Sequence, residues 1–549
     1  MTSAAFPRNM LFPHIHILRS AICGLRPHYI TCKVPGMGTQ RIRMDMLLGL
    51  AALLALLRFA NVRSLSVGFL VDTDITQDHS TNQPRASKVP TVAEDSLASY
   101  CSAALDGTEG RLKGHDPEGG SWQGWQLMQV QVLLRHGARS GIHSIPGWVE
   151  PHNFSCVLSP EVAAMVHSWP NVFTVKAASA GLETLQRSWG PEVQADGRFC
   201  RRGQLNAAGF QQLLQLGRHL RTAYGQPHHS LLTGLKSGDV YARSTDYTRT
   251  RASAASLLSG LLGASFEVAP DLAPLRLEVH ENEADEVMFG VGRTSSSRHI
   301  NNAVTDTSMA EEVRDGSCPK AVKLGNAQES TFQTSPEASE VLNGLFSTEA
   351  RDQKITSSAD AIYAAKCDGG PLPCSARGCL TLADAQRIAK EADRWYCETS
   401  TGTSGGAAAT RLAFQPLIKE VLERMQLALA GGATAHAPRI AVLAGHDTVI
   451  APLAAALGFF AGNCRWPPFA SHIVFELWHR PDAFAEGDAA AAVRILFNGV
   501  PVTSDVFGCA NDGSNDGNRH SELCPLDLFA AAVADLLAGH PTLEAACAE

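Results

Sequence analysis

The sequence has no excess of positive charge and no long apolar segment. Its 549 residues include 46 Lys and Arg against 54 Asp and Glu, which gives a formal net charge of -8. A sequence-wide cationic field is therefore absent, and we expect no nucleic acid partner. The apolar run at 46–57 is shorter than the roughly 20 residues that a membrane-spanning helix usually needs. Any anion that the protein binds must meet a local cluster of cations.

Two further absences narrow the class of protein. The cysteines form no close CxxC pairs of the kind found in zinc ribbons, so metal binding through them is the weaker interpretation. The chain also has no internal repeat of fixed period. Hydrophobic residues make up 45% and charged residues 18% of the sequence, which is ordinary for a chain that buries a large core. The sequence therefore predicts a mainly globular protein, long enough for two or three packed units.

The first part of the chain has the pattern of a leader. Residues 1–43 contain six Lys or Arg and no Asp or Glu, and the apolar run that follows ends at Arg58. A basic segment before a short apolar core is typical of a secretory signal peptide, with small residues at Ser64 and Ser66 as a cleavage site. We interpret 1–66 as a leader into the secretory pathway, which leads to the ER or Golgi lumen or out of the cell.

Two other interpretations of this leader stay open. If Arg58 and Arg63 snorkel, the apolar stretch extends toward Val71 and forms a type II membrane anchor. An Arg-rich leader without acidic residues also fits an organelle transit peptide. Residues 67–96 have the composition of a polar linker, and we expect the folded domain to cover 97–549.

The cysteine count fits an oxidising compartment. Of the 14 cysteines, 12 remain when Cys23 and Cys32 of the leader are set aside. An even number in a chain that enters the lumen predicts disulfide bonds, whose pairing the sequence leaves open. The triplet Asn153-Phe154-Ser155 is an acceptor for N-glycosylation and fits the same compartment.

Apolar strands that end in polar residues and lead into helices recur along the chain. One predicted strand ends at Arg135, and another covers 440–444 before a helix over 449–457 with Pro452 in about its first turn. Asn206 can cap a helix that Gly225 ends. A third strand begins at Val240 and precedes a helix over 250–262.

This alternation predicts an α/β fold with a mainly parallel sheet flanked by helices. In such folds, ligands bind beyond the carboxyl ends of the strands. Between about 269 and 395 the alternation weakens, and we interpret this range as a mostly helical cap or insertion, partly disordered.

The segment Arg135-His136-Gly137-Ala138-Arg139 places an imidazole between two guanidinium groups at the end of the first strand. Arg offers a fixed, always charged fork that suits the several oxygens of a phosphoryl group. Neighbouring cations disfavour imidazolium, so they keep His136 neutral and nucleophilic. Taken alone, the segment also fits an ordinary turn with solvated arginines.

Two other segments follow predicted strands. Arg243-Ser244-Thr245-Asp246 fits a capped helix start with a surface Arg when taken alone, and Gly445-His446-Asp447 fits a turn. In a parallel sheet, however, all three segments would converge at one edge. An Arg-flanked His, a third Arg and a His-Asp pair in one place suit the hydrolysis of a phosphomonoester.

The sequence resembles the histidine acid phosphatases, the second branch of the histidine phosphatase superfamily. The matching segments lie between about Gln129 and Pro525, outside the central insertion. They are VLLRHGAR, VYARSTDYTRT, VLAGHDTVIAPLAAALG, WPPFASHIVFELW, VRILFNGV and CPLDLF.

The resemblance implies a role for each candidate residue. His136 would attack phosphorus and form a phosphohistidine, and Asp447 would donate a proton to the leaving group. The phosphoryl oxygens would be held by Arg135, Arg139, Arg243 and His446. No metal or other cofactor is implied.

The leading hypothesis is a lumenal or secreted phosphomonoesterase that acts on a phosphorylated sugar. The segments PCSARGC, FELWHRPDAF and ILFNGVPVT are similar to those of family members that dephosphorylate 2-phosphoxylose in the glycosaminoglycan linkage region. Alternatives are a broad acid phosphatase or phytase and, less favoured, a non-catalytic anion-binding module. The presence of both His136 and Asp447 argues against the last, because binding alone needs neither a nucleophile nor a proton donor.

Overall fold

The computed structural model describes residues 22–26, 29–34, 38–43, 96–112, 124–177, 189–195, 197–226, 229, 231–263, 274–280, 285–289, 318–430, 437–461, 464–481, 490–509 and 522–548. The chain divides into two units, 1–91 and 92–549. In the first, strands β1 (Ile22–Arg26), β2 (Tyr29–Val34) and β3 (Gly38–Arg43) form an antiparallel sheet in that order. The apolar run at 46–57 and nearly all of the predicted linker lie outside the described residues.

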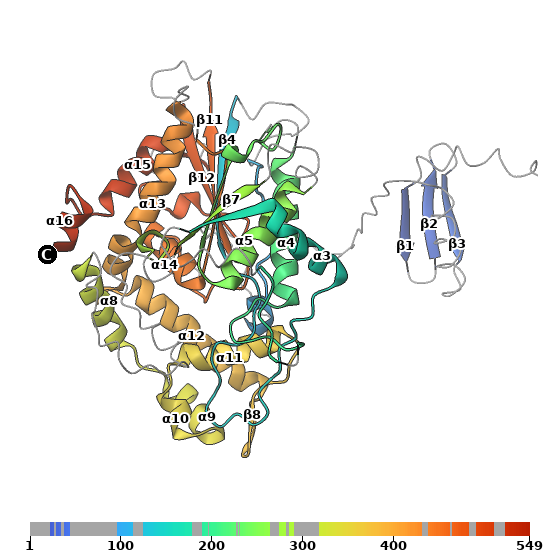
Figure 1. Ribbon diagram of the computed structural model, residues 1–549, viewed down its shortest axis with the longest axis vertical. Helices are drawn as coiled ribbons and strands as arrows, with labels where there is room; N and C mark the ends of the chain where they lie inside the picture. Colours follow the sequence, from blue (N-terminus) through green and yellow to red (C-terminus); the bar gives the residue numbers. More distant parts are fainter. Residues whose placement is uncertain are drawn as a thin grey trace, which may run out of the picture. The chain divides into compact units, whose positions relative to one another are not determined.

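A mixed sheet forms the centre of the second unit (Figure 1). Its strand order is β13-β12-β11-β4-β10-β6-β7-β5, and β14 pairs with β12. The strands from β4 to β5 in this order run parallel, whereas β11, β12 and β13 form antiparallel pairs. The bounds are β4 Gln126–Arg135, β5 Phe173–Ala177, β6 Val240–Thr245, β7 Leu275–His280, β10 Ile440–Gly445, β11 His472–His479, β12 Ala491–Phe497, β13 Val500–Pro501 and β14 Cys524–Pro525.

Helices cover both faces of this sheet, which confirms the predicted α/β class and its mainly parallel sheet. Helices α4 and α5 pack on one face, and α13 and α14 pack on the other (Figure 1). The bounds are α2 Ser96–Tyr100, α3 Pro160–Val172, α4 Ala207–Tyr224, α5 Thr248–Leu262, α7 Glu286–Phe289, α8 Pro319–Thr331, α9 Pro336–Leu345, α10 Thr348–Asp352, α11 Ile355–Cys367, α12 Leu382–Thr401, α13 Gly406–Ala430, α14 Asp447–Leu457, α15 Leu526–Asp535 and α16 Leu543–Ala548.

Strand β4 lies inside the sheet, and both of its faces are buried. Its alternating apolar residues pack with α4 and α5. On the other face, Gln129 and Gln131 are completely buried, and their side-chain amides donate to backbone carbonyls of Pro438 at 2.7 Å and of Val421, in α13, at 2.8 Å. The alternation that predicted a strand therefore reflects two helix-covered faces, with the polar face satisfied by hydrogen bonds.

The predicted caps of α4 are confirmed, and one detail of α14 is corrected. The Asn206 side chain accepts a hydrogen bond from the backbone N–H of Gly209 at 3.0 Å, and the helix ends at Gly225. Helix α14 begins earlier than predicted, at Asp447, so Pro452 lies in its second turn rather than its first. The helix starts directly after the strand because His446 serves as its N-cap residue.

The range predicted for the cap starts too early. Strand β7 lies within 269–395 but belongs to the main sheet, between β6 and β5. Its buried residues alternate with partly exposed ones, the pattern of a strand covered by helices on one side. Helices α8 to α12 follow, and β8 (Cys374–Ser375) and β9 (Gly378–Cys379) form a small hairpin between α11 and α12. The division into leader, linker and domain stays a prediction.

Disulfide bonds join all the cysteines that follow the predicted leader, as their even count predicted. Several of them connect segments that are far apart in the sequence, which restricts the unfolded chain and stabilises the fold. The pairs are Cys101–Cys367, Cys156–Cys200, Cys318–Cys547, Cys374–Cys379, Cys397–Cys464 and Cys509–Cys524.

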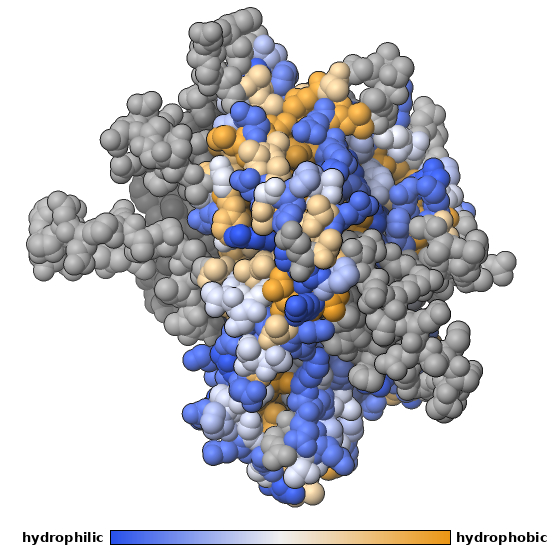
Figure 2. Space-filling view, turned by 90° about the vertical axis from the view of Figure 1, so that its left-hand side faces the viewer, coloured by the Kyte–Doolittle hydropathy of each residue, from blue (hydrophilic) through white to orange (hydrophobic). Residues whose placement is uncertain are grey.

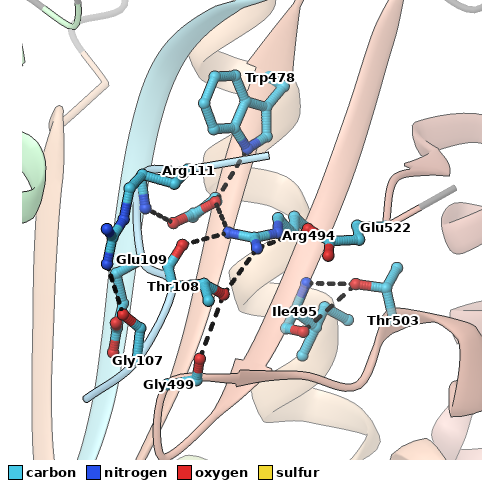
Figure 3. Close-up of polar contacts among 12 residues, drawn as sticks. Gly107, Thr108, Glu109, Arg111, Trp478, Arg494, Ile495, Gly499, Thr503 and Glu522 are labelled. Atoms are coloured by element: carbon cyan, nitrogen blue, oxygen red, sulfur yellow. Dashed lines mark hydrogen bonds and ion pairs between the residues drawn. The ribbon is translucent and has the colours of Figure 1, made fainter. Parts of the chain in front are cut away.

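A buried charge network fixes the segment that precedes β4 (Figure 3). Arg494 of β12 donates to the backbone carbonyl and to the hydroxyl of Thr108, each at 2.9 Å. The same guanidinium pairs with Glu522 at 2.6 Å and with Glu476 at 3.3 Å. Because a buried cation needs partners that offset its loss of hydration, these contacts hold the residues around Thr108 on the antiparallel side of the sheet.

One face of the molecule is mostly hydrophilic in its lower half (Figure 2). On the face formed by the left-hand side of Figure 1, hydrophobic residues gather in the upper half (Figure 2). The exposed large hydrophobic side chains include Leu427 in α13, Leu528 in α15, and Phe507, which lies before α15. The guanidinium of Arg411 lies over the ring of Phe507 at 4.3 Å, so this ring is partly covered.

No described helix is long and apolar enough to cross a membrane.

The contact between α4 and α5 gives a test of the packing. A Cβ atom at Gly217 would lie 2.1 Å from the carbonyl oxygen of Leu257, so the two helix backbones touch there. We expect Gly217→Ala to lower the free energy of unfolding by about 1–3 kcal/mol or more, through overpacking. Gly344 in α9 has no atom within 4 Å of its added Cβ, so Gly344→Ala should raise stability by about 0.4–1 kcal/mol. Urea unfolding measures the free energy of unfolding of both variants. Equal changes in the two variants would contradict the close contact between α4 and α5.

Candidate active site

Three of the predicted segments meet at one edge of the sheet. Strand β10 lies between β4 and β6, and in register Gly445 is opposite Arg135. Because the three strands run parallel, the residues that follow them lie at the same edge. The structure accordingly brings His136 and His446 together, with ring centroids 5.5 Å apart.

Gly137 allows the loop after β4 to pack closely on α4. A Cβ atom at this position would lie 2.5 Å from the carbonyl oxygen of Gly209, in the first turn of that helix. The backbone N–H of Gly137 donates to the Ser253 hydroxyl of α5 at 3.2 Å. The loop that carries His136 is therefore held by both helices on this face of the sheet.

His136 is buried and has a defined tautomer. Its Nδ1 lies 2.9 Å from the carbonyl oxygen of Gly137, which can only accept a hydrogen bond. Nδ1 therefore carries the proton, and the neutral ring keeps its lone pair on Nε2. This is the form of imidazole that can attack an electrophile.

Burial and neighbouring cations keep this imidazole neutral. Burial, followed by the positive charges of Arg249, Arg135 and Arg139, lowers the pKa of His136 well below the ordinary value of 6.5. The nucleophilic form therefore persists in mildly acidic solution, where an ordinary histidine is protonated.

The guanidinium of Arg135 is completely buried and donates to three oxygen partners. Its Nη2 donates to the Tyr100 hydroxyl and to Oδ2 of Asp447, each at 2.7 Å, and its Nη1 donates to the carbonyl of Pro467. The charge also lies 4.4 Å from the ring centroid of Phe469. These contacts fix the fork at the edge of the sheet.

Asp447 begins α14, and its carboxylate has two partners at Oδ2. Beside Arg135, the indole N–H of Trp466 donates to it at 2.8 Å. Burial by itself would raise the pKa of Asp447, but the Arg135 cation and the Trp466 N–H group bring it down to about 2. The carboxyl group is therefore ionised while the site holds no anion.

Arg139 is buried against the cap. Its Nη2 pairs with Oδ1 of Asp360, from α11, at 2.6 Å, and its Nη1 donates to the carbonyl of Ser140 at 3.1 Å. The Nε–H groups of Arg139, Arg135 and Arg249 are buried, and none of the described residues accepts from them.

Arg243, predicted to hold phosphoryl oxygens, does not join this group. It pairs with Asp285, and its Nη1 lies 3.3 Å from Glu420 of α13. The reason is its place inside β6. It is opposite Leu443, which packs in the core on the α13 side, and residues paired across strands point to the same face.

Arg249, which our sequence analysis did not select, stands in the predicted place of Arg243. It lies in the first turn of α5, beyond the end of β6, and its positive charge lowers the pKa values of His136 and His446. Burial and the nearby Arg139 lower the pKa of Arg249 itself to about 10. The signal was available in VYARSTDYTRT, because its second Arg lies beyond the strand end, at the edge of the sheet, whereas its first lies inside the strand.

His446 completes the group. Its Nε2 lies 3.1 Å from the Thr245 hydroxyl, and its ring is edge-on to that of Tyr247, with centroids 5.2 Å apart. Burial, and then Arg249, lowers the pKa of His446 well below 6.5. The guanidinium of Arg249 in turn lies 4.1 Å from the Tyr247 ring centroid.

The arrangement can bind a compact anion with several oxygens and attack it. Three guanidinium groups supply donors, a neutral imidazole supplies a nucleophile, and a carboxyl group stands beside one of the cations. In the part of the chain that the structure describes, no group of three or more His, Cys, Asp or Glu side chains is placed to hold a metal ion.

Comparisons with known proteins give one family model and several similar proteins. The family model for the histidine phosphatase superfamily (branch 2) matches residues 126–359 and 392–498, more than half of the chain. The chain is similar to 2-phosphoxylose phosphatase 1 of Danio rerio, with 26% identity over 89% of this chain and 94% of that protein. It is 25% identical to the Homo sapiens protein of that name, over 89% and 93% of the two chains. A solved phytase from Citrobacter braakii aligns with a TM-score of 0.43 and 14% identity, over 75% of this chain and 98% of that one.

The different roles of Arg243 and Arg249 predict different effects of their substitution on the free energy of unfolding. Arg243→Met leaves the buried Asp285 without its cation, so we expect the free energy of unfolding to fall by about 3–5 kcal/mol. Arg249→Met removes a cation that is close to Arg139, and we expect a change of less than about 1 kcal/mol. Urea unfolding of the two variants measures this difference, and a larger loss for Arg249→Met would contradict the assignment.

Proposed function

We propose a mechanism for this chain, which belongs to the histidine phosphatase superfamily (branch 2): His136 attacks the phosphorus atom of a phosphomonoester, and Asp447 protonates the departing oxygen. In the first step, the lone pair of Nε2 forms a bond to phosphorus while the ester oxygen leaves and takes the proton. In the second, water attacks phosphorus and gives a proton to the Asp447 carboxylate, the P–N bond breaks and its electron pair returns to Nε2, and phosphate leaves neutral His136 behind. Each step conserves atoms and charge.

The observation that carries this proposal is the state of His136. Its proton lies on Nδ1, so the lone pair is on Nε2, and burial together with three guanidinium groups keeps the ring neutral. Arg135, Arg139 and Arg249, with His446, would hold the phosphoryl oxygens. Because cations placed in advance stabilise the charge that develops on these oxygens, the same groups lower the barrier to attack.

Asp447 is ionised in the free site, so its proton must come with the substrate. A phosphate monoester loses its second proton near about pH 6, and below this the monoanion dominates. When a phosphoryl group binds, its negative charge opposes that of the carboxylate and competes for Arg135, and both effects raise the pKa of Asp447. The carboxyl group can then take the substrate proton and pass it to the leaving oxygen, which favours activity in acid.

For the substrate we propose a phosphorylated sugar, 2-phosphoxylose, in preference to a multiply phosphorylated compound such as phytate. Support comes from the similarity to proteins named 2-phosphoxylose phosphatase 1 along most of the chain. It also comes from the local charge, because Asp447 and Asp360 offset much of the charge of the three guanidinium groups. Such a site suits one phosphoryl group.

The proposed compartment is the lumen of the secretory pathway. Six disulfide bonds join the cysteines that follow the predicted leader, and such bonds form and persist in an oxidising environment. Whether the leader is cleaved or serves as a membrane attachment does not affect the chemistry of the site.

The substrate proposal predicts a clear preference. We expect the leader-free protein to hydrolyse a 2-phosphoxyloside with a kcat/KM at least about tenfold above that for phytate or for other sugar phosphates, a difference of about 1.4 kcal/mol in transition-state binding. Release of inorganic phosphate measures each rate. Comparable rates across the panel would contradict the narrow substrate and favour a broad acid phosphatase.

The proton-donor role predicts a dependence on the leaving group. Asp447→Asn cannot donate a carboxyl proton, so kcat should fall about 10²–10⁴-fold for an alkyl phosphate, which leaves as a poor alkoxide. The loss should be at least tenfold smaller for 4-nitrophenyl phosphate, whose leaving group needs little protonation. Equal losses on both substrates would show that Asp447 has a different role. His136→Ala is the control, because it should abolish turnover of both.

A further inference from the structure

A carboxylate from the cap bonds the loop after β4, which carries Arg139. Asp360 of α11 is buried, and its Oδ1 pairs with Nη2 of Arg139 at 2.6 Å. Its Oδ2 accepts hydrogen bonds from the backbone N–H groups of Ile142 at 3.1 Å and His143 at 3.2 Å. One side chain thus fixes both a guanidinium group and the turn that follows it.

These contacts keep Asp360 charged inside the protein. Burial alone would raise the pKa of Asp360, but the Arg139 cation and the hydrogen bonds to the carboxylate lower it. A buried carboxylate is stable only when its oxygens are satisfied, and here every partner belongs to the loop after β4. The pair therefore locks α11 and this loop in one relative position.

Helix α11 is itself anchored close to Arg135, the other arginine that flanks His136. The Cys101–Cys367 disulfide joins its last residue to the segment after α2. The ring of Tyr363 stacks on that of Tyr100, with centroids 3.6 Å apart, and the Tyr100 hydroxyl accepts from Arg135. The cap consequently contacts Arg139 directly, through Asp360, and supports Arg135 indirectly, through the ring of Tyr100.

We propose that Asp360 is a positioning residue of the phosphate site, through which the cap sets the orientation of Arg139. This inference rests on the proposed function. Asp360 does not touch the substrate. With Nη2 held by Asp360 and Nη1 by the Ser140 carbonyl, the plane of the guanidinium is fixed, and its remaining N–H groups are left for phosphoryl oxygens. Asp360 lies between the two segments that the family model matches, 126–359 and 392–498.

The first test compares two aspartates of the same region. Asp360→Asn offers one oxygen where the carboxylate offered two, so Arg139 or the turn loses its partner. We expect kcat/KM for 4-nitrophenyl phosphate to fall about ten- to hundredfold, because small misplacements of a binding group cost this much. Asp368, directly after α11, bonds Asn206 at 2.8 Å and His152 at 2.7 Å and contacts none of the active-site arginines. Asp368→Asn should therefore stay within about twofold of the wild type. Equal effects of the two substitutions would overturn the proposal.

A double-mutant cycle separates positioning from general damage. If Asp360 acts through Arg139, then Asp360→Asn should cause no further loss of kcat/KM in an Arg139→Met background. If the fold-loss of kcat/KM in the double variant equals the product of the two single losses, Asp360 acts independently of Arg139, and the inference is overturned. Thermal unfolding confirms that each variant is folded. If Asp360→Asn does not fold, Asp360→Glu serves in its place, because it keeps the charge but displaces the oxygens by one methylene group, and it should lose activity in the same direction.

Binding of inorganic phosphate distinguishes failure of this inference from failure of the proposed function. If the wild type binds phosphate but hydrolyses no ester, the proposed reaction is wrong, and calorimetry still tests Asp360. Asp360→Asn should then bind phosphate at least about tenfold more weakly, a loss of about 1.4 kcal/mol. Unchanged affinity would overturn the positioning role, and so would a wild type that binds no phosphate.

Discussion

A neutral imidazole surrounded by fixed cations is the constraint on which the site depends. Protonation of His136 would add a positive charge beside Arg135, Arg139 and Arg249 in a buried place, so the ring stays neutral and Nε2 stays free. The same repulsion among cations is relieved when an anion enters. Relief of this repulsion contributes to the affinity of the site for a phosphoryl group. The same arrangement of charges therefore favours both the binding of the phosphoryl group and its attack by His136.

The fold holds two of these three like charges in place through buried partners of their guanidinium groups. Asp447 and Tyr100 hold Arg135, and Asp360 holds Arg139. These partners come from the helix after β10, from the first helix of the domain and from the cap, so the site forms only when distant segments are folded. Disulfides such as Cys101–Cys367 connect the same segments and limit their separation.

Local sequence patterns predicted the elements that carry the site but not the partners that orient it. The strand that ends at Arg135 and the caps of α4 follow from short-range periodicity, and the structure confirms them. Arg243 was predicted as a site residue and Arg249 was not considered, because the sequence does not show at which residue the strand ends, and the strand end decides which Arg reaches the sheet edge. Asp360 had no local signal, since its role arises from a contact 221 positions away in the chain.

The central claim is that Nε2 of His136 forms a covalent bond to phosphorus, and trapping this intermediate tests it most directly. The protein is mixed with a radioactively labelled phosphomonoester, quenched during turnover in alkaline denaturant, and digested. We predict label on the peptide that contains His136, in an acid-labile bond, and none in His136→Ala. Label on another residue, or rapid turnover without any labelled peptide, would contradict the account.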